Sequence, residues 1–177
     1  VIRYDEPSWP WYSIHRPREQ SIFESTLKIL VPYRCKINSF AICDESIYSS
    51  RDVFFITTIE NNHVNLFAIS SILNSKLMYY WLYNKGKRKG DTLELYNTPL
   101  SEIPISSNVA NYYDVFERYT KRIIQLKYDS DEFKSLMLQI NTLVYKLYEL
   151  SYEEVLLIEP DFGQRVSVEE YEKVSVE

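Results

Sequence analysis

Four basic residues lie within five positions near the middle of the 177-residue chain: Lys85, Lys87, Arg88 and Lys89. Gly86 and Gly90 accompany them, and the whole sequence has only three glycines. A turn built this way can bring ammonium and guanidinium groups against phosphates, and Arg88 could donate two hydrogen bonds to a guanine edge in the major groove. We therefore expect these residues to contact nucleic acid. The simpler alternative is a solvated surface turn.

A second basic set surrounds the first predicted strand. Arg16 and Arg18 precede this strand, Lys28 lies within it, and Arg34 follows it. On a common face these side chains would hold the sugar-phosphate backbone of a nucleic acid. For Lys28 the alternative is an ordinary outward-facing strand residue. Tyr83, at the end of a tyrosine-tryptophan cluster with helical spacing, lies next to the basic turn and is expected to be exposed and to take part in the nucleic-acid contact.

Other polar residues have simpler interpretations. Asn74 is expected to be structural, with its amide hydrogen-bonding a neighbouring loop. His15 and His63 lack carboxylate or cysteine partners at metal-ligand spacing, so neither a metal site nor a catalytic role is expected for them. Cys35 and Cys43 are too few to form a disulfide framework and are expected to be free thiols.

Charge is unevenly distributed along the chain. The net charge of −5 argues at first against a polyanionic partner, because such binding depends on neutralising phosphates. Residues 1–105 nevertheless contain 12 basic and 11 acidic residues, whereas residues 106–177 contain 8 basic and 14 acidic ones. The excess acid therefore belongs to the C-terminal part. Glycine scarcity argues against a glycine-rich nucleotide-binding loop, and no apolar run has the length of about 20 residues that spans a bilayer. We expect a cytoplasmic protein with no membrane partner.

The first part of the chain, residues 1–105, predicts a compact β module with one packed helix. Short runs rich in β-branched and aromatic residues predict strands at Leu27–Val31, Phe40–Cys43 and Val53–Thr58. Apolar residues then recur at helical spacing from an N-cap at Asn65 to about Asn84. After a polar basic stretch that reaches Asp91, the chain from 93 to 105 is expected to be extended.

The second part, residues 106–159, predicts an antiparallel helical hairpin and a short third helix. Apolar residues spaced by three and four form one seam along two helices, and its members are Tyr112, Phe116, Tyr119, Ile123, Leu126, Phe133, Leu136, Ile140, Leu143, Leu147 and Leu150. Ser151 and Glu154 have capping-box spacing and open the third helix, which Pro160 ends. Residues 160–177 are expected to form a loosely ordered acidic tail. The predicted fold class is α+β.

Several of these pieces occur together in one order, namely Phe23, Leu27–Pro32, Phe40–Ala41, Asp52, Phe54–Ile56, Leu73–Lys76, Gly86–Gly90, Tyr96 and Leu100–Ile105. This succession covers about residues 9–105, and it resembles the C-terminal specificity domain of TaqI-like adenine methyltransferases and of type IIG restriction-modification enzymes. The segment Asn141–Ser151 followed by Glu153 and Glu154 is similar to the helical end of these proteins and of type I specificity subunits.

The resemblance implies a module of a bacterial protein that binds double-stranded DNA and docks against an N-terminal methyltransferase domain of the same parent chain. No Asn/Asp-Pro-Pro-Tyr/Phe motif and no glycine-rich cofactor turn occur here. No catalytic, cofactor-binding or metal residue is therefore assigned, and S-adenosylmethionine is expected in a parental domain outside this chain. The sequence leaves open whether the parent is also an endonuclease.

One alternative is a protein-interaction module. In that case the helical hairpin, residues 108–150, would pair with a partner subunit through its apolar seam, and the β module would be a scaffold. A hydrolase or other enzyme is disfavoured, because no nucleophile-base arrangement or carboxylate cluster stands out.

Overall fold

The computed structural model describes residues 19–50, 52–59 and 63–175, and it confirms the predicted α+β class. The strands in this part are β1 (Lys28–Pro32), β2 (Arg34–Cys35), β3 (Ala41–Cys43), β4 (Val53–Ile56), β5 (Lys87–Lys89) and β6 (Thr92–Glu94). The helices are α1 (Gln20–Glu24), α2 (Leu66–Leu73), α3 (Lys76–Lys85), α4 (Asn97–Ser101), α5 (Tyr113–Ile124), α6 (Asp131–Leu147), α7 (Tyr152–Ile158) and α8 (Val168–Lys173). None of these helices is long and apolar enough to cross a membrane.

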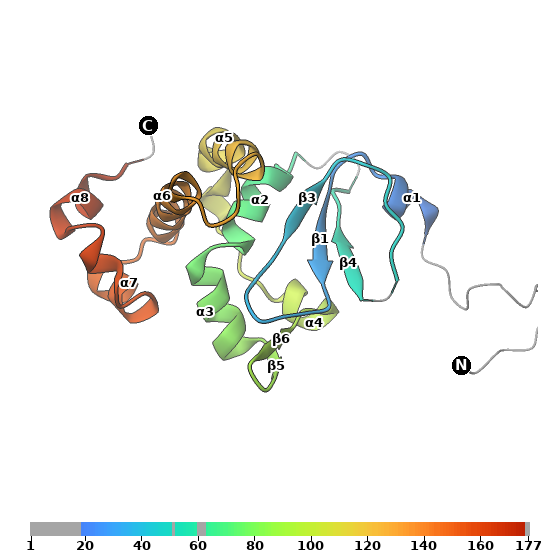
Figure 1. Ribbon diagram of the computed structural model, residues 1–177, viewed down its shortest axis with the longest axis horizontal. Helices are drawn as coiled ribbons and strands as arrows, with labels where there is room; N and C mark the ends of the chain where they lie inside the picture. Colours follow the sequence, from blue (N-terminus) through green and yellow to red (C-terminus); the bar gives the residue numbers. More distant parts are fainter. Residues whose placement is uncertain (1–18, 51, 60–62, 176–177) are drawn as a thin grey trace, which may run out of the picture.

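The first sheet has the strand order β3-β1-β4 and is antiparallel throughout. Its central strand places Ile29 opposite Ile42 and Ile56, and the side chains of Ile29 and Val31 are fully buried. The three predicted strands are thus confirmed, with ends that differ by one or two residues. Apolar residues on the inner face of this sheet pack against α2 and α3 (Figure 1).

The long helix predicted between Asn65 and Asn84 is interrupted, and the chain forms α2 and α3 instead. Asn65 is the predicted N-cap, and its side chain accepts a hydrogen bond from the Ala68 amide. The interruption occurs at Ser75, which adopts an extended conformation and caps α3 by accepting from the Met78 amide. Asn141 of α6 stabilises the new helix start by accepting a hydrogen bond of 2.8 Å from the Lys76 amide. Apolar spacing alone could not reveal this break, because the periodicity continues across it.

The second sheet has the order β2-β6-β5, so the basic stretch after α3 is one strand of a β-hairpin. Gly90 forms its turn with φ of +60°, a left-handed conformation that favours glycine. The following segment was expected to be extended throughout, but α4 occupies part of it. Leu93 and Leu95 are buried in the same core cluster as Ile29 and Val31, which anchors the base of the hairpin.

Helices α5 and α6 form the predicted antiparallel hairpin and lie beside α2 (Figure 1). The core crosses the expected module boundary at residue 105, because Ile72 of α2 and Phe116 of α5 belong to one buried cluster. The hydroxyl groups of Ser71 and Thr120 also hydrogen-bond across this contact at 2.5 Å. The apolar seam of the helical hairpin is therefore used largely inside the chain.

Residues 161–175, expected to be part of a loosely ordered tail, instead fold against α6 and α7. The predicted capping box of α7 is confirmed, and Ser167 with Glu170 forms a second one that opens α8. The rings of Phe162 and Tyr171 are fully buried with those of Tyr145 and Tyr152. This aromatic packing gives the end of the chain a core of its own, which acidic composition alone does not indicate.

Candidate nucleic-acid interface

The second sheet brings Arg34 beside the basic residues after α3, although about fifty residues separate them in the sequence. Glu94 on the central strand β6 is the direct cross-strand neighbour of Arg34 on β2 and of Lys87 on β5. The three side chains form one row across the sheet, since directly opposed residues point to the same face. A single carboxylate thus lies between two cations.

Glu94 organises this row through direct contacts. Its Oε1 accepts hydrogen bonds from Nε and Nη2 of Arg34 at 3.0 and 2.7 Å, and its Oε2 lies 3.5 Å from Nζ of Lys87. The hydrogen bond from Arg34 lowers the pKa of the Glu94 carboxyl below its ordinary value, against the opposing effect of burial. The same bond raises the pKa of Arg34. All three groups are therefore charged at neutral pH, with a sum of +1.

Aromatic rings support the cations of the row. Nζ of Lys87 lies 5.1 Å from the centre of the Tyr96 ring, and the guanidinium of Arg34 lies 5.0 Å from the centre of the Tyr33 ring. The Tyr96 side chain, followed by the charge of Glu94, raises the pKa of Lys87. A cation above an aromatic face is attracted by the negative face of the ring. These contacts keep the charges outside the core while restricting their orientation.

Arg88 lies on the opposite face of the hairpin from Lys87, because successive strand residues alternate between faces. Its guanidinium carbon lies 4.0 Å from the centre of the Tyr83 ring at the end of α3. Tyr83 is 36% exposed, which confirms the prediction that it is accessible. The basic residues of the hairpin therefore occupy two faces, and Arg88 and Tyr83 form a pair separate from the row around Glu94.

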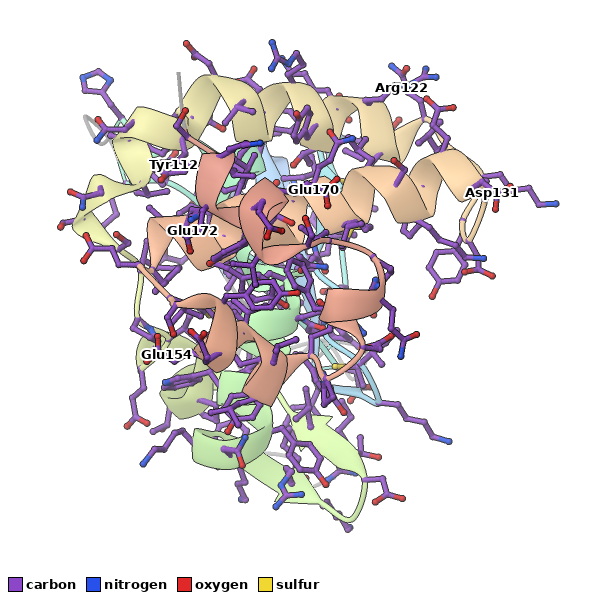
Figure 2. The ribbon with its side chains drawn as sticks, turned by 90° about the vertical axis from the view of Figure 1, so that its left-hand side faces the viewer. Tyr112, Arg122, Asp131, Glu154, Glu170 and Glu172 are labelled. Atoms are coloured by element: carbon purple, nitrogen blue, oxygen red, sulfur yellow. The ribbon has the colours of Figure 1, made fainter. Side chains whose placement is uncertain are left out.

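The hairpin is open to solvent over its whole outer strand. Lys85, Lys87, Arg88 and Lys89 are all exposed. Figure 1 shows the hairpin at the lower edge of the molecule, beyond the end of α3, whereas α7 and α8 form the left-hand end. Figure 2 looks onto that end, where Glu154 of α7 and Glu170 and Glu172 of α8 are found. The acidic helices thus do not cover the basic hairpin.

The prediction for one contact residue, Lys28, is wrong. Lys28 was expected to reach phosphate or to face outwards, but its side chain is completely buried. Its ammonium group donates hydrogen bonds to the carbonyl oxygens of Phe23, at 2.9 Å, and Ser25, which satisfy the charge inside the protein. The alternation of the strand could not predict this burial, because a lysine side chain is almost never fully buried in a protein core. Lys28 holds the chain after α1 against β1.

The predictions for Arg16, Arg18 and His15 stay predictions, because these residues lie outside the described part of the chain. The structural role expected for Asn74 is confirmed, because its amide exchanges two hydrogen bonds with the backbone of Phe40, at 2.8 and 2.9 Å. The structure contains no cluster of metal-ligating side chains within its described part.

Sequence reasoning missed the residues that organise the surface. Neither Glu94 nor Tyr33 is indicated by the sequence, nor is the exposed Lys36 that follows β2, and Tyr96 is indicated only by the family resemblance and not as a support for Lys87. The alternation of Thr92, Leu93 and Glu94 could have predicted a strand, and hence a hairpin with the basic run. Nothing in the sequence pairs this strand with β2, because that contact depends on the tertiary fold.

A separate concave region is chemically unlike the hairpin. A groove of about 750 Å³ lies between the segment before β3 and the helices α2, α5 and α6. Its lining is mainly apolar and includes Phe40, Ile123 and Met137. Two of the cations in its lining, Lys134 and Arg165, are already paired with Asp129 and Glu159, so the exposed hairpin is the better candidate for a nucleic-acid contact.

Comparisons with known proteins point in one direction. Residues 8–105 match the family described as the TaqI-like C-terminal specificity domain. The chain is 30% identical over 150 residues to the Type II methyltransferase M.HindII of Haemophilus influenzae, and 29% identical over 147 residues to the Type II methyltransferase M.HincII of the same species. These alignments cover 80% and 78% of this chain but only 28% and 29% of the relatives. The chain thus spans less than a third of the length of each relative.

Proposed function

Because the chain belongs to the family of TaqI-like C-terminal specificity domains, we propose that it recognises the DNA site at which a restriction-modification methyltransferase acts. The observation that carries the proposal is the β2-β6-β5 sheet, which brings Arg34 of β2 beside Lys87, Arg88 and Lys89 of the projecting β5–β6 hairpin. The partner is double-stranded DNA, and the cations supply the attraction to its phosphates.

The shape of the hairpin suits this role. The major groove of duplex DNA is about 12 Å wide and admits a two-stranded β-ribbon. Strands β5 and β6 form a hairpin of this kind, with β2 along the inner edge of β6, and its free outer edge carries three consecutive exposed basic residues, Lys87, Arg88 and Lys89. Residues on both faces of an inserted ribbon can reach either base edges or the phosphates of the groove walls.

We place the methyl-transfer chemistry in another domain of the parent protein, N-terminal to this module. The glycines of this chain all serve local structure: Gly86 ends α3, Gly90 forms the hairpin turn, and Gly163 packs beside Tyr152. None is available for the glycine-rich turn that cradles a nucleotide-like cofactor, so the residues present do not fit S-adenosylmethionine. We propose that the protein acts in the cytoplasm of a bacterial cell, where its DNA substrate lies.

An anisotropy titration with a fluorescent duplex oligonucleotide tests the proposal. Wild-type protein should bind at low salt and lose affinity as salt rises, because each neutralised phosphate contributes about 0.9 to the slope of log K against log salt. The double variant Lys85→Gln/Lys89→Gln should bind more weakly and lower this slope by about 0.9 for each contact removed. Both lysines are exposed, so the fold should survive the change.

The matched control is the double variant Lys127→Gln/Lys173→Gln, which also removes two exposed lysines but leaves the hairpin intact. It should retain the wild-type salt slope. A wild-type affinity independent of salt would contradict the proposal. Equal slopes in the two double variants would instead assign the binding surface to another part of the molecule.

The reading frame upstream of Val1 tests the proposed parent. An Asn-Pro-Pro-Tyr-type motif there would support a methyltransferase. A nuclease signature of the form Asp…Glu-x-Lys further upstream would extend the proposal to a type IIG endonuclease. Absence of both motifs would contradict the proposed parent without changing the DNA-binding prediction.

The alternative of a helical pairing module receives less support. Its seam residues Phe116, Ile140 and Leu147 are buried against α2 and α3 within the chain. Pairing through this seam would require the core to open. Light scattering on the wild-type protein tests it directly, since a module of this kind would form dimers or bind a partner subunit through α5 and α6.

A further inference from the structure

The cations of the β2-β6-β5 sheet differ in how many of their hydrogen-bond donors are free. Arg34 directs Nε and Nη2 to a single carboxylate oxygen of Glu94. Lys87 is shared between the same carboxylate and the Tyr96 ring. The protein thus already occupies donors of both side chains, and they can attract a ligand mainly through their positive charge.

Arg88 is different, because it is held without using its donors. Its guanidinium carbon lies 4.0 Å from the centre of the Tyr83 ring, while its side chain is exposed. Across residues 19–50, 52–59 and 63–175 it has no hydrogen bond or ion pair with another side chain. An arginine that stacks on an aromatic face keeps its planar array of N–H groups available along the edge of the plane.

Tyr83 is itself fixed by the helix. It is the eighth residue of α3, and its ring lies 5.9 Å from that of Tyr79 one turn earlier. Tyr79 is partly buried against the core cluster beneath the first sheet. The orientation of the Arg88 plane is therefore set by a rigid element rather than by the hairpin turn. A donor array fixed in this way loses little conformational freedom on binding.

A planar donor group with a fixed orientation is better suited to a directional hydrogen-bond acceptor than to a diffuse negative charge. The O6 and N7 atoms of guanine form a pair of acceptors in the major groove that matches the arginine fork. Phosphates can be neutralised by flexible lysines such as Lys85 and Lys89, which have no ion-pair partner among the described residues. The hairpin thus combines one oriented donor array with mobile charges on either side.

We propose that Arg88 is the specificity-determining residue of the hairpin, that it recognises a guanine edge in the major groove, and that Tyr83 is a positioning residue that holds its plane. This inference rests on the proposed DNA-recognition function. Lys85 and Lys89 contact phosphates and contribute affinity for any sequence. Arg34 and Lys87, held by Glu94, stabilise the base of the hairpin.

The experiment uses the 177-residue chain and a pool of duplex oligonucleotides with a randomised central segment. Bound duplexes are selected and sequenced for the wild type, Arg88→Lys and Lys89→Gln. The wild type should enrich a site with at least one strongly preferred guanine. Arg88→Lys should reduce the preference for that guanine over the other bases by about 5- to 150-fold. Lys89→Gln should keep the preferred site while it weakens binding to every duplex.

Two measurements separate base recognition from a general loss of charge or of folding. The salt slope of Arg88→Lys should equal that of the wild type, because the positive charge is retained. Replacing the selected guanine by 7-deazaguanine, which lacks the N7 acceptor, should weaken binding by the wild type more than binding by Arg88→Lys, because lysine has no rigid fork that depends on both acceptors. Circular dichroism checks that each variant is folded.

The role of Tyr83 is tested by Tyr83→Phe and Tyr83→Leu. Phenylalanine keeps the aromatic face and should preserve the guanine preference, whereas leucine should reduce it without changing the salt slope. A role limited to stability would alter unfolding but not the selected sequence.

The outcomes distinguish the two proposals. If Arg88→Lys selects the wild-type site with undiminished preference, the role of Arg88 is overturned while DNA binding stands. If the wild type binds DNA but enriches no sequence, the assignment of a base-specific residue also fails, and salt-dependent binding still supports the module as a DNA-binding surface. If the wild type does not bind the pool at low salt, both proposals fail.

Discussion

The β5–β6 hairpin and the C-terminal end formed by α7 and α8 use tyrosines and charged residues in opposite ways. In the hairpin, Tyr83 and Tyr96 lie at the surface and support Arg88 and Lys87. At the C-terminal end, the rings of Tyr145, Tyr152, Phe162 and Tyr171 form a buried cluster. Burial raises the pKa of Tyr171 to about 12, so its hydroxyl stays neutral in this core. Tyrosine rings therefore support exposed cations in the hairpin and form a buried core at the C-terminal end.

Each region also contains one buried carboxylate bound by an arginine. Glu94 pairs with Arg34, and Glu159 pairs with Arg165 at 2.7 Å while it also accepts a hydrogen bond from the Tyr145 hydroxyl at 3.0 Å. The surroundings differ, because a second cation, Lys87, lies beside Glu94, whereas a second carboxylate, Asp161, shares Arg165 with Glu159. Segregation of charge explains how a chain of net charge −5 can still present a surface suited to a polyanion.

The largest effect is expected at the C-terminal aromatic core. Phe162→Ala should lower the free energy of unfolding by about 3–5 kcal/mol, because it removes a fully buried ring and leaves a cavity. Urea unfolding followed by circular dichroism measures the loss. The salt slope of DNA binding by the folded fraction should not change, since Phe162 lies away from the hairpin. A stability like that of the wild type would mean that this end of the chain is as loosely held as its composition suggests.

The next largest loss of stability is expected when Glu159, one of the two buried carboxylates, is removed. Glu159→Ala should cost about 1–3 kcal/mol, because it leaves the buried Tyr145 hydroxyl and one side of Arg165 without a partner. Glu94→Ala should cost less stability, since both of its cationic partners are half exposed and water can replace the carboxylate. The same unfolding assay on both variants gives the order. Equal losses would contradict the extra cost assigned to the buried Tyr145 hydroxyl, a kind of partner that Glu94 lacks.

Sequence reasoning was most successful where a single local pattern determines the structure. The strands before residue 59, the capping box of α7 and the hairpin of α5 and α6 follow from periodicity and cap residues. It failed where a distant residue decides the outcome. Asn141 of α6 fixes the start of α3, and the backbone of Phe23 and Ser25 satisfies the charge of Lys28. No local pattern contains these partners.

The candidate site was predictable only in part, for the same reason. The cluster Lys85–Lys89 and the exposure of Tyr83 could be inferred, because the basic run and its neighbour are contiguous. The row formed by Arg34, Glu94 and Lys87 could not, because it depends on the pairing of β2 with β6. Charge counts identify which residues can contact phosphate, but not which of them are already occupied by a carboxylate.

A smaller effect is expected at the cap of α8. Ser167→Ala should cost about 1 kcal/mol, because the side chain accepts from the Glu170 amide and completes a capping box. The capping interaction also lowers the pKa of Glu170 below its ordinary value. Hydrogen exchange of the amides at residues 168–173 should accelerate in the variant. Ser49→Ala, which changes a serine outside any helix, is the matched control and should leave these rates unchanged.

The smallest effect is expected on the pH dependence of stability, and it concerns the Glu94 carboxylate of the hairpin. Hydrogen bonding to Arg34 lowers the pKa of Glu94 from its ordinary value of 4.5, so its ionised form favours the folded state. This contribution is complete above the unfolded value, and it is lost as the pH falls through the folded value. Wild-type stability should therefore decline in acid slightly more steeply than that of Glu94→Gln. The difference should be small, because both cationic partners are half exposed and salt screens them.

Glu102→Gln, which removes an exposed carboxylate after α4, is the control for the loss of one negative charge. Its acid dependence should follow that of the wild type, since Glu102 has no ion pair among the described residues. NMR titration of the Arg34 and Lys87 side chains between neutral pH and pH 3 locates the transition at the hairpin. If Glu94→Gln and the wild type decline in parallel, the carboxylate does not stabilise the folded hairpin. In that case the β2-β6 pairing itself, and not the Arg34–Glu94 contact, would have to hold the basic strand in place.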